Sequence, residues 1–268
     1  MNARRIHNRV CGGLLVLVLC AVPAWADIPL GVRACWELDE GSGTIAHDTS
    51  GNGFHGTFYS NPAWVPGVQG PALEFLDHDL VWQIPAAFDD TVTNGFTIAS
   101  WVNRYDDPPP QKYGIAFDAR RGDSRGGFCL WVGTDGGVSF GVLKNSTTYQ
   151  RIDGTHTVRP DEWTHVTATF DYAASTLRLF VDGLEDSASP VPASEPYHNS
   201  YSNPAIGNNH WAPGDGQFAP FHGIQDEVYF YDRALSASEI YDLYAATPEP
   251  GSWVLLALGV AAAARRRG

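Results

Sequence analysis

The amino-acid sequence predicts an all-β protein, a sandwich or a barrel. Short runs rich in β-branched and aromatic residues recur along the chain, separated by clusters of Gly, Asp, Asn and Pro. Segments with helical periodicity are scarce, and residues 27–246, which lie between two apolar terminal segments, have the length of one large sandwich. We find no internal repeat and no second domain boundary.

Eight runs predict strands. In chain order they cover residues 34–38, 72–76, 96–102, 127–132, 137–143, 163–170, 177–181 and 225–231. The sequence Asp135-Gly136-Gly137 predicts a hairpin, and Asp182-Gly183 predicts a type I′ turn. This spacing of strands and turns is typical of a β-sandwich or barrel.

One short helix is predicted near the end of the domain. Ser236 and Glu239 have the S-x-x-E spacing of a capping box. Ile240, Leu243 and Tyr244 then fall on one face of the helix. We therefore expect the helix to pack this face on the sandwich.

Residues 1–26 have the three parts of a secretory signal peptide. An arginine-containing start is followed by an apolar run over residues 11–22 and by Ala24-Trp25-Ala26, the small-x-small form that signal peptidase cleaves. The run is too short for a stable membrane anchor, and a buried N-terminal helix is the weaker alternative. We predict cleavage after Ala26 and export through the inner membrane.

Residues 247–268 form a second sorting segment. Pro248-Glu249-Pro250 precedes an apolar run over residues 252–264, and three arginines follow this run. The run is shorter than the roughly 20 residues of a transmembrane helix, but arginines stay on the cytoplasmic side of a membrane. We expect residues 252–264 to hold the protein in the membrane, transiently or permanently, with the domain on the periplasmic or outer side.

The domain between these segments is strongly acidic. Without the six terminal arginines, 11 of the 17 basic residues remain against 30 acidic ones, a net charge of −19. Such a surface repels nucleic-acid phosphates and attracts divalent cations. Nucleic acid is therefore not an expected partner.

Two cysteines remain after removal of the signal peptide, Cys35 and Cys129. An exported protein meets oxidising conditions that permit a disulfide, but buried unbridged cysteines are also common. The sequence leaves both possibilities open.

Four segments resemble, in order, the bacterial laminin-G-like, concanavalin A-like lectin domains. They are CWELDEGSGTIAHDTSGNGFHGTF, FTIASWVN, DEWTHVTATFDYAASTLRLFVDG and FHGIQDEVYFYDRALSASEIYDLY. The resemblance covers residues 30–245 and implies a jelly roll of two curved antiparallel sheets, with the first and last strands adjacent. Gln225 departs from the pattern, because the family usually has an apolar residue before the Asp-Glu pair.

The C-terminal segment resembles the PEP-CTERM sorting tail of bacteria that make extracellular polysaccharide. The Pro-Glu-Pro motif, the apolar run and the basic end are all present. The resemblance implies that an exosortase cleaves near the motif.

The sequence Asp48-Thr49-Ser50-Gly51-Asn52-Gly53 predicts a calcium loop. Oxygen-bearing side chains at alternate positions before a glycine suit an ion that prefers several oxygen ligands. The predicted ligands are Asp48, Ser50 and Asn52, and the resemblance adds Asp226, because the family commonly places calcium where the first and last strands meet. The alternative is an Asx-type turn that binds no metal.

The acidic run Glu37-Leu38-Asp39-Glu40 invites comparison with sandwich-fold glycosidases, which place three carboxylates on one face of a strand. Alternation requires the third carboxylate two residues after the second, but here it follows directly. The run therefore does not predict a hydrolase, and we expect no catalytic residues.

A sugar-binding surface is predicted in the loop around residues 197–211. Flat rings suit the apolar faces of sugars, and amides suit their hydroxyl groups. The candidate residues are Tyr197, Tyr201, Asn209, His210 and Trp211, with Trp64, Trp82 and Tyr105 as possible extensions.

These observations predict an exported noncatalytic module at the cell surface or in the matrix. Its expected partners are extracellular polysaccharide or a surface protein, besides signal peptidase and exosortase, and its expected cofactor is a structural calcium ion. A purely structural matrix protein is the first alternative, and a carbohydrate-active enzyme is the second.

Overall fold

The computed structural model describes residues 28–60, 62–76, 79–82, 84–85, 95–106, 113–119, 127–145, 148–191, 204–208 and 218–247. The strands are β1 Val32–Trp36, β2 Ile45–Ala46, β3 Gly56–Phe58, β4 Ala63–Pro66, β5 Pro71–Phe75, β6 Val81–Trp82, β7 Gly95–Arg104, β8 Tyr113–Asp118, β9 Gly127–Gly133, β10 Gly137–Asn145, β11 Thr148–Thr157, β12 Thr164–Asp171, β13 Thr176–Val181, β14 Leu184–Pro190, β15 Ala205–Ile206, β16 Phe218–Pro220 and β17 Gly223–Tyr231, and the helix is α1 Ala237–Ala246.

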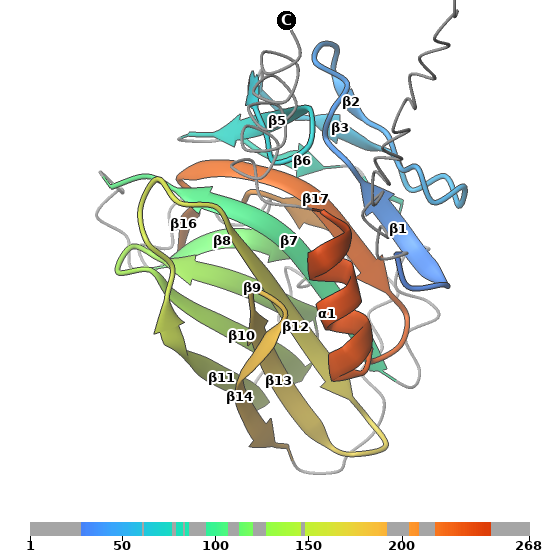
Figure 1. Cartoon of the computed structure of the whole chain (residues 1–268), viewed down its shortest axis with the longest axis vertical. Coiled ribbons are helices and arrows are strands. Elements are labelled where there is room, and N and C mark those ends of the chain that lie inside the picture. The colour runs from blue at the N-terminus through green and yellow to red at the C-terminus, as the bar shows by residue number, and fades with distance from the viewer. Residues whose placement is uncertain are drawn as a thin grey trace, which may run out of the picture.

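The strands form two sheets (Figure 1). The eight-stranded sheet has the order β14-β13-β12-β7-β17-β5-β4, with β1 also paired to β17. The nine-stranded sheet has the order β11-β10-β9-β8-β15-β6-β3-β2, with β16 also paired to β8. All pairs are antiparallel except β16 with β8. This is the predicted two-sheet sandwich.

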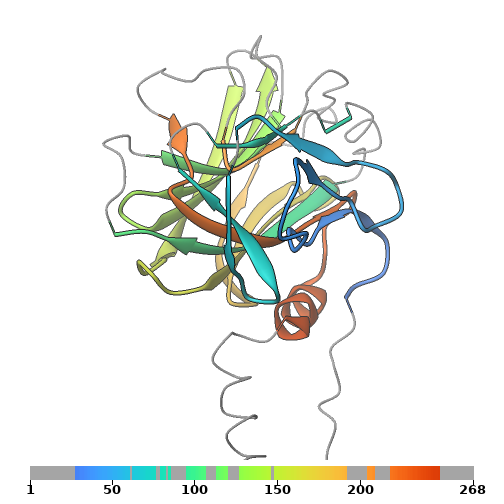
Figure 2. The ribbon, with the colours of Figure 1, turned by 90° about the horizontal axis from the view of Figure 1, so that it is seen from above.

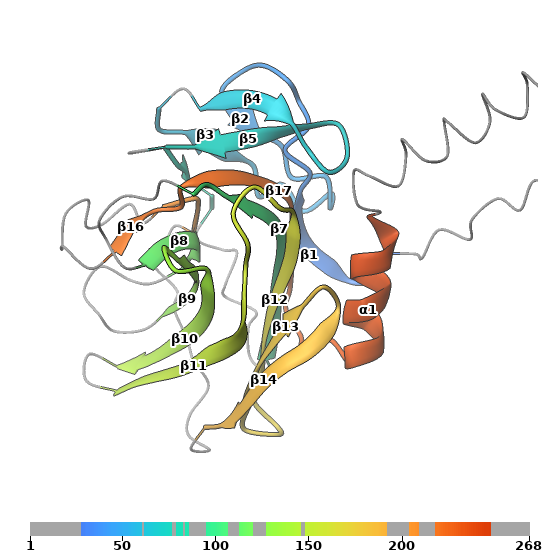
Figure 3. The same cartoon turned by 60° about the vertical axis from the view of Figure 1, so that its left-hand side comes forward.

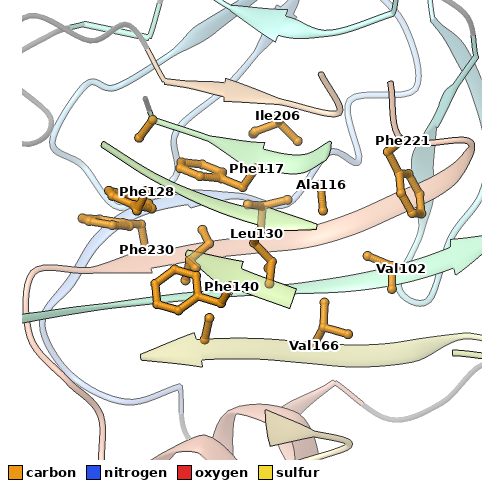
Figure 4. Packing of buried hydrophobic residues seen from close by; sticks show 14 of the residues in the cluster. Val102, Ala116, Phe117, Phe128, Leu130, Phe140, Val166, Ile206, Phe221 and Phe230 are labelled. Atoms are coloured by element: carbon orange, nitrogen blue, oxygen red, sulfur yellow. The ribbon is translucent and has the colours of Figure 1, made fainter. Parts of the chain in front are cut away.

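The hydrophobic core lies between the two sheets, where alternate side chains of each strand meet. On β9, Phe128 and Leu130 enter the core while Cys129 faces the other way. Figure 4 shows Phe128 and Phe230, which come from opposite sheets and stack with their ring centroids 5.8 Å apart. Each buried phenylalanine stabilises the sandwich by about 1.5–3 kcal/mol.

The first and last strands of the domain are adjacent, as the resemblance implies. Strand β1 pairs with β17, so that Cys35 lies opposite Tyr229 and Trp36 lies opposite Val228. A register shift interrupts β17 between Asp226 and Tyr229, where it pairs with β7. Two acidic residues of the sheet lie at this bulge.

Helix α1 forms an outer layer on the eight-stranded sheet, on the side away from β8 to β11 (Figures 2 and 3). The predicted capping box is present, because the Ser236 hydroxyl accepts from the Glu239 amide and the Glu239 carboxylate accepts from the Ser236 amide. Ile240 and Leu243 are buried against the outer face of the sheet. Tyr244 stacks on Trp101 with ring centroids 5.6 Å apart.

The two cysteines of the domain are not joined by a disulfide. Cys35 packs in the cluster beneath α1, on the outer face of the eight-stranded sheet. Cys129 belongs to the nine-stranded sheet and faces away from the core, so that the whole sandwich separates the two sulfur atoms.

No helix in the described parts of the chain has the length and hydrophobicity needed to cross a membrane.

Candidate functional site

The predicted calcium loop is a compact turn after β2. Asp48 is 5% exposed, and its Oδ1 accepts from the amides of Cys35 and Ser50, each at 2.9 Å. Its Oδ2 accepts from the amide of Phe54 at 2.9 Å. Burial alone would raise the pKa of Asp48, but hydrogen bonds from Ser50, Cys35 and Phe54 outweigh burial and lower it. The carboxylate therefore stabilises the turn as an anion.

The other two loop residues bind backbone as well. The Ser50 hydroxyl donates to the carbonyl oxygen of Arg33 at 3.2 Å, and the Asn52 side-chain amide donates to the same oxygen at 3.0 Å. Asp48, Ser50 and Asn52 are thus brought together by hydrogen bonds that tie the turn to β1.

Asp226 lies at the bulge in β17 and accepts hydrogen bonds from a different turn, the one between β4 and β5. It is completely buried, and its Oδ2 accepts from the amides of Val68 at 2.8 Å and Gln69 at 3.3 Å, between β4 and β5. Its Oδ1 accepts from the amide of Glu227 at 3.0 Å. Burial and the neighbouring Glu227 carboxylate raise the pKa of Asp226 to about 8.

Glu227 is also buried, and its backbone has a left-handed φ of 52°. The Tyr229 hydroxyl donates to its carboxylate. Burial raises the pKa of Glu227 to about 7, an effect that the Tyr229 hydrogen bond opposes and that the charges of Glu37 and Asp39 increase. Two adjacent carboxyl groups therefore bind protons near neutral pH.

The four predicted calcium ligands make hydrogen bonds to different groups in this structure. The Asp48 and Asp226 carboxylates accept from separate backbone segments, and the Ser50 and Asn52 side chains donate to a carbonyl group. The described residues contain no group of three or more His, Cys, Asp or Glu side chains placed to hold a metal ion. The hydrogen bonds of Asp48 to the amides of Ser50 and Cys35 are compatible with the Asx-turn alternative, and calcium binding stays a prediction.

The acidic run after β1 lacks the geometry of a glycosidase strand. Strand β1 ends at Trp36, and Leu38 has a φ of 58°, which breaks the alternation of an extended strand. Glu37 accepts from the Thr49 hydroxyl at 3.1 Å, and Glu40 accepts from the His47 amide at 2.6 Å. These two carboxylates thus form hydrogen bonds with the segment that contains His47 and Thr49.

The predicted sugar-binding residues Tyr197, Tyr201, Asn209, His210 and Trp211 lie outside the described residues, as do Ala24, Ala26, Pro248, Glu249 and Pro250. Of the possible extensions, Trp64 packs against the core and Tyr105 donates a hydrogen bond to Glu74. Trp82 lies beside the exposed Tyr59, and Tyr105 lies beside His222.

Trp82 and the exposed side chains around it lie on the outer face of three short strands, β2, β3 and β6. We call this surface the β2–β3–β6 face. Its members are Ile45, His47, His55, Thr57, Tyr59 and Trp82. Alternate residues Ala46, Phe58 and Val81 point into the core. Sequence reasoning missed Tyr59, His47 and His55, although the alternation of core and surface residues along 45–47 and 54–59 was the signal that could have found them.

A sandwich of two antiparallel sheets with adjacent terminal strands is the architecture of lectin-like β-proteins. A family model described as the concanavalin A-like lectin/glucanases superfamily matches residues 81–241, and the chain belongs to this superfamily. The resemblance seen in the sequence is therefore confirmed. A search of curated protein sequences finds no match.

Solved structures share the fold at low sequence identity. Domain 4 of AbnA, an extracellular arabinanase from Geobacillus stearothermophilus in complex with arabinotriose, is 20% identical, with a TM-score of 0.60 over 80% of this chain and 98% of that one. The binding domain of Paraclostridial Mosquitocidal Protein 1 is 16% identical, with a TM-score of 0.63 over 80% of this chain and 52% of that one. The binding domain of botulinum neurotoxin DC in complex with SialylT is 13% identical, with a TM-score of 0.61 over 83% of this chain and 53% of that one.

A PEP-CTERM protein-sorting motif matches residues 246–267. The match confirms the sorting segment seen in the sequence and marks the chain as an exported surface protein that an exosortase processes.

Proposed function

We propose that the chain is an exported noncatalytic module that binds extracellular polysaccharide at the cell surface or in the surrounding matrix. The observation that carries the proposal is the lectin-like sandwich joined to a surface-sorting motif. Support comes from AbnA domain 4, which has the same fold over nearly its whole length and is in complex with arabinotriose.

The carboxylates of the described residues support a noncatalytic role. A retaining glycosidase needs two carboxyl groups about 5 Å apart across an open cleft. Here Asp226 and Glu227 are buried, and Asp48, Glu37 and Glu40 bind neighbouring backbone or hydroxyl groups. These five carboxylates therefore have structural partners in place of a substrate.

One experiment on the full exported chain distinguishes a polysaccharide-binding function from a hydrolytic one. We expect the purified protein to bind one or more polysaccharides on a glycan array and to release no reducing ends from them. Trp211→Ala tests the predicted loop, since loss of its ring should weaken binding if the sugar stacks there.

Absence of binding to every glycan would overturn this function and favour a purely structural matrix protein. Release of reducing ends would favour a carbohydrate-active enzyme.

A further inference from the structure

The β2–β3–β6 face presents two aromatic rings at right angles. Tyr59 is 63% exposed, and its ring meets that of the partly buried Trp82 with centroids 5.4 Å apart and an interplanar angle of 89°. The backbone fixes the pair, because Thr57 lies directly opposite Trp82 and the Tyr59 amide donates to the carbonyl oxygen of Leu80 at 3.1 Å. An exposed tyrosine is thus held in place beside an indole ring.

Two histidines share the β2–β3–β6 face with the two rings. His47 and His55 are exposed neighbours with ring centroids 5.3 Å apart. The Nδ1 atom of His55 accepts from the Asp48 amide at 2.9 Å, so a neutral His55 carries its proton on Nε2 and offers a donor. The Tyr59 hydroxyl and the Trp82 indole N–H make no hydrogen bond to any described residue, which leaves both able to bind a ligand.

The size of the face favours a sugar chain over a folded partner. Neighbouring strands lie about 4.8 Å apart and alternate residues about 6.8 Å apart, so the face spans roughly 10 by 13 Å. A stable protein interface needs about 800 Å² on each partner, with a broad apolar centre. Only Ile45, at 43% exposure, adds a large aliphatic side chain to the rings.

The charge of the face and of the chain favours a neutral ligand. The β2–β3–β6 face contains no lysine or arginine, and the whole chain has a formal net charge of −13. Polysaccharides that carry carboxylate or sulfate groups would meet repulsion without a compensating cation.

We propose that the β2–β3–β6 face is a binding site for a neutral polysaccharide, and its strand β6 pairs with β15, which belongs to the predicted loop at residues 197–211. One sugar ring stacks on Tyr59 and accepts a hydrogen bond from the Trp82 indole N–H, and a neighbouring sugar of the same chain binds the His55 imidazole, which lies two alternate positions, about 13 Å, along the strand. This site rests on the proposed polysaccharide-binding function and adds a location and a ligand charge to it.

The test is affinity electrophoresis or calorimetry of the full exported chain with a neutral arabinan, a neutral β-glucan and a polyuronate. We expect binding to a neutral polymer that is insensitive to salt, and a loss of about tenfold in Tyr59→Ala, equivalent to about 1.4 kcal/mol. Tyr59→Phe should keep most of the affinity, because it keeps the ring.

Tyr241→Ala is the matched control, since Tyr241 is 51% exposed but lies on helix α1. Trp82→Ala should also weaken binding, and its melting temperature shows whether it folds. Tyr59→Ala should fold normally because so much of its side chain is exposed.

The outcomes distinguish this site from the broader function. If the chain binds a neutral polymer and Tyr59→Ala binds equally well, the β2–β3–β6 face is not the site, while the proposed function stands. If the chain binds no polysaccharide, both are overturned. Preference for the polyuronate, or a change in self-association in Tyr59→Ala, would overturn the assignment of a neutral sugar.

Discussion

Gln225 shows how one polar residue is accommodated in an apolar core. Its side chain is completely buried in β17, and its Nε2 donates to the carbonyl oxygen of Ala116 in the opposite sheet at 3.2 Å. Its Oε1 has no hydrogen-bond partner among the described residues. The residue that departs from the family pattern therefore joins the two sheets but leaves one buried acceptor unpaired.

Gln225→Met should leave the free energy of unfolding unchanged or raise it by up to about 1 kcal/mol, because it removes the unpaired acceptor at similar volume. The Ala116 carbonyl keeps a hydrogen bond from the Gly207 amide at 3.0 Å. Urea unfolding measures the effect, with Gln225→Ala as the cavity-forming control. Equal losses in both variants would show that the inter-sheet hydrogen bond stabilises the fold.

Asp226 and Glu227 make stability depend on pH. Their folded-state pKa values of about 8 and about 7 lie above those of unfolded chains, so the folded protein binds more protons between about pH 4 and pH 8. Their contribution to stability is complete below about pH 4 and is lost as the pH rises, by at most about 1.4 kcal/mol per pH unit for each group.

Glu227→Gln should reduce this loss of stability between pH 6 and pH 9, as measured by urea unfolding at several pH values. The comparison with the parent protein is needed because burial lowers the pKa of His165 to about 3, which makes stability rise with pH below about pH 6.5. Parallel pH curves for parent and variant would contradict the assignment to Glu227.

At the scale of single elements, the sequence predicts the central strands well. The runs at 96–102, 127–132 and 163–170 correspond to β7, β9 and β12, which are buried and rich in β-branched and aromatic residues. The Asp182-Gly183 turn has φ angles of 49° and 75°, as the predicted type I′ turn requires. Here local chemistry and long-range packing favour the same structure.

Edge strands were missed for a physical reason. Strands β11 and β14 lie at the ends of their sheets, and their sequences TYQRIDGTHT and LEDSASP are largely polar. An edge strand needs little apolar surface, because its neighbours supply the pairing. Very short strands such as β2 and β6 carry too few residues to show a period at all.

The candidate site illustrates a second limit of sequence reasoning. Spacing alone indicated that Asp48, Ser50 and Asn52 share one loop, and the structure brings them together. Carboxylate and hydroxyl oxygens bind either a cation or backbone amides, however, and only the fold shows which amides are close. Asp226 lies far from this loop in sequence, so its backbone partners were not accessible from spacing.

The stability of helix α1 depends on its N-cap residue, Ser236, which directly precedes the helix. Ser236→Ala should lower the free energy of unfolding by about 1 kcal/mol, because the helix loses the side chain that accepts from the Glu239 amide at 3.3 Å. Thermal unfolding measures the change. Asp242→Ala, an exposed substitution inside the helix, should be neutral or slightly stabilising, and an equal loss there would contradict a capping effect.

At the scale of the whole molecule, metal removal tests the calcium prediction. The backbone hydrogen bonds of Asp48 and Asp226 predict that a chelator leaves the melting temperature of the full chain unchanged. A rise in melting temperature with added calcium would support the predicted calcium site, since an ion that binds only the native state stabilises that state. Asn52→Ala would then be expected to abolish the rise.

The end of helix α1 has a consequence for how the protein is displayed. Thr247, its C-cap, is 4% exposed, and its amide donates to the carbonyl oxygen of Tyr244 at 3.4 Å. The next residues in sequence are Pro248, Glu249 and Pro250, and the sorting motif begins at residue 246. The packed helix therefore ends next to the sorting motif in sequence. We expect a protease that recognises this motif to meet the folded C-terminal turn of α1 within a few residues of the Pro-Glu-Pro sequence.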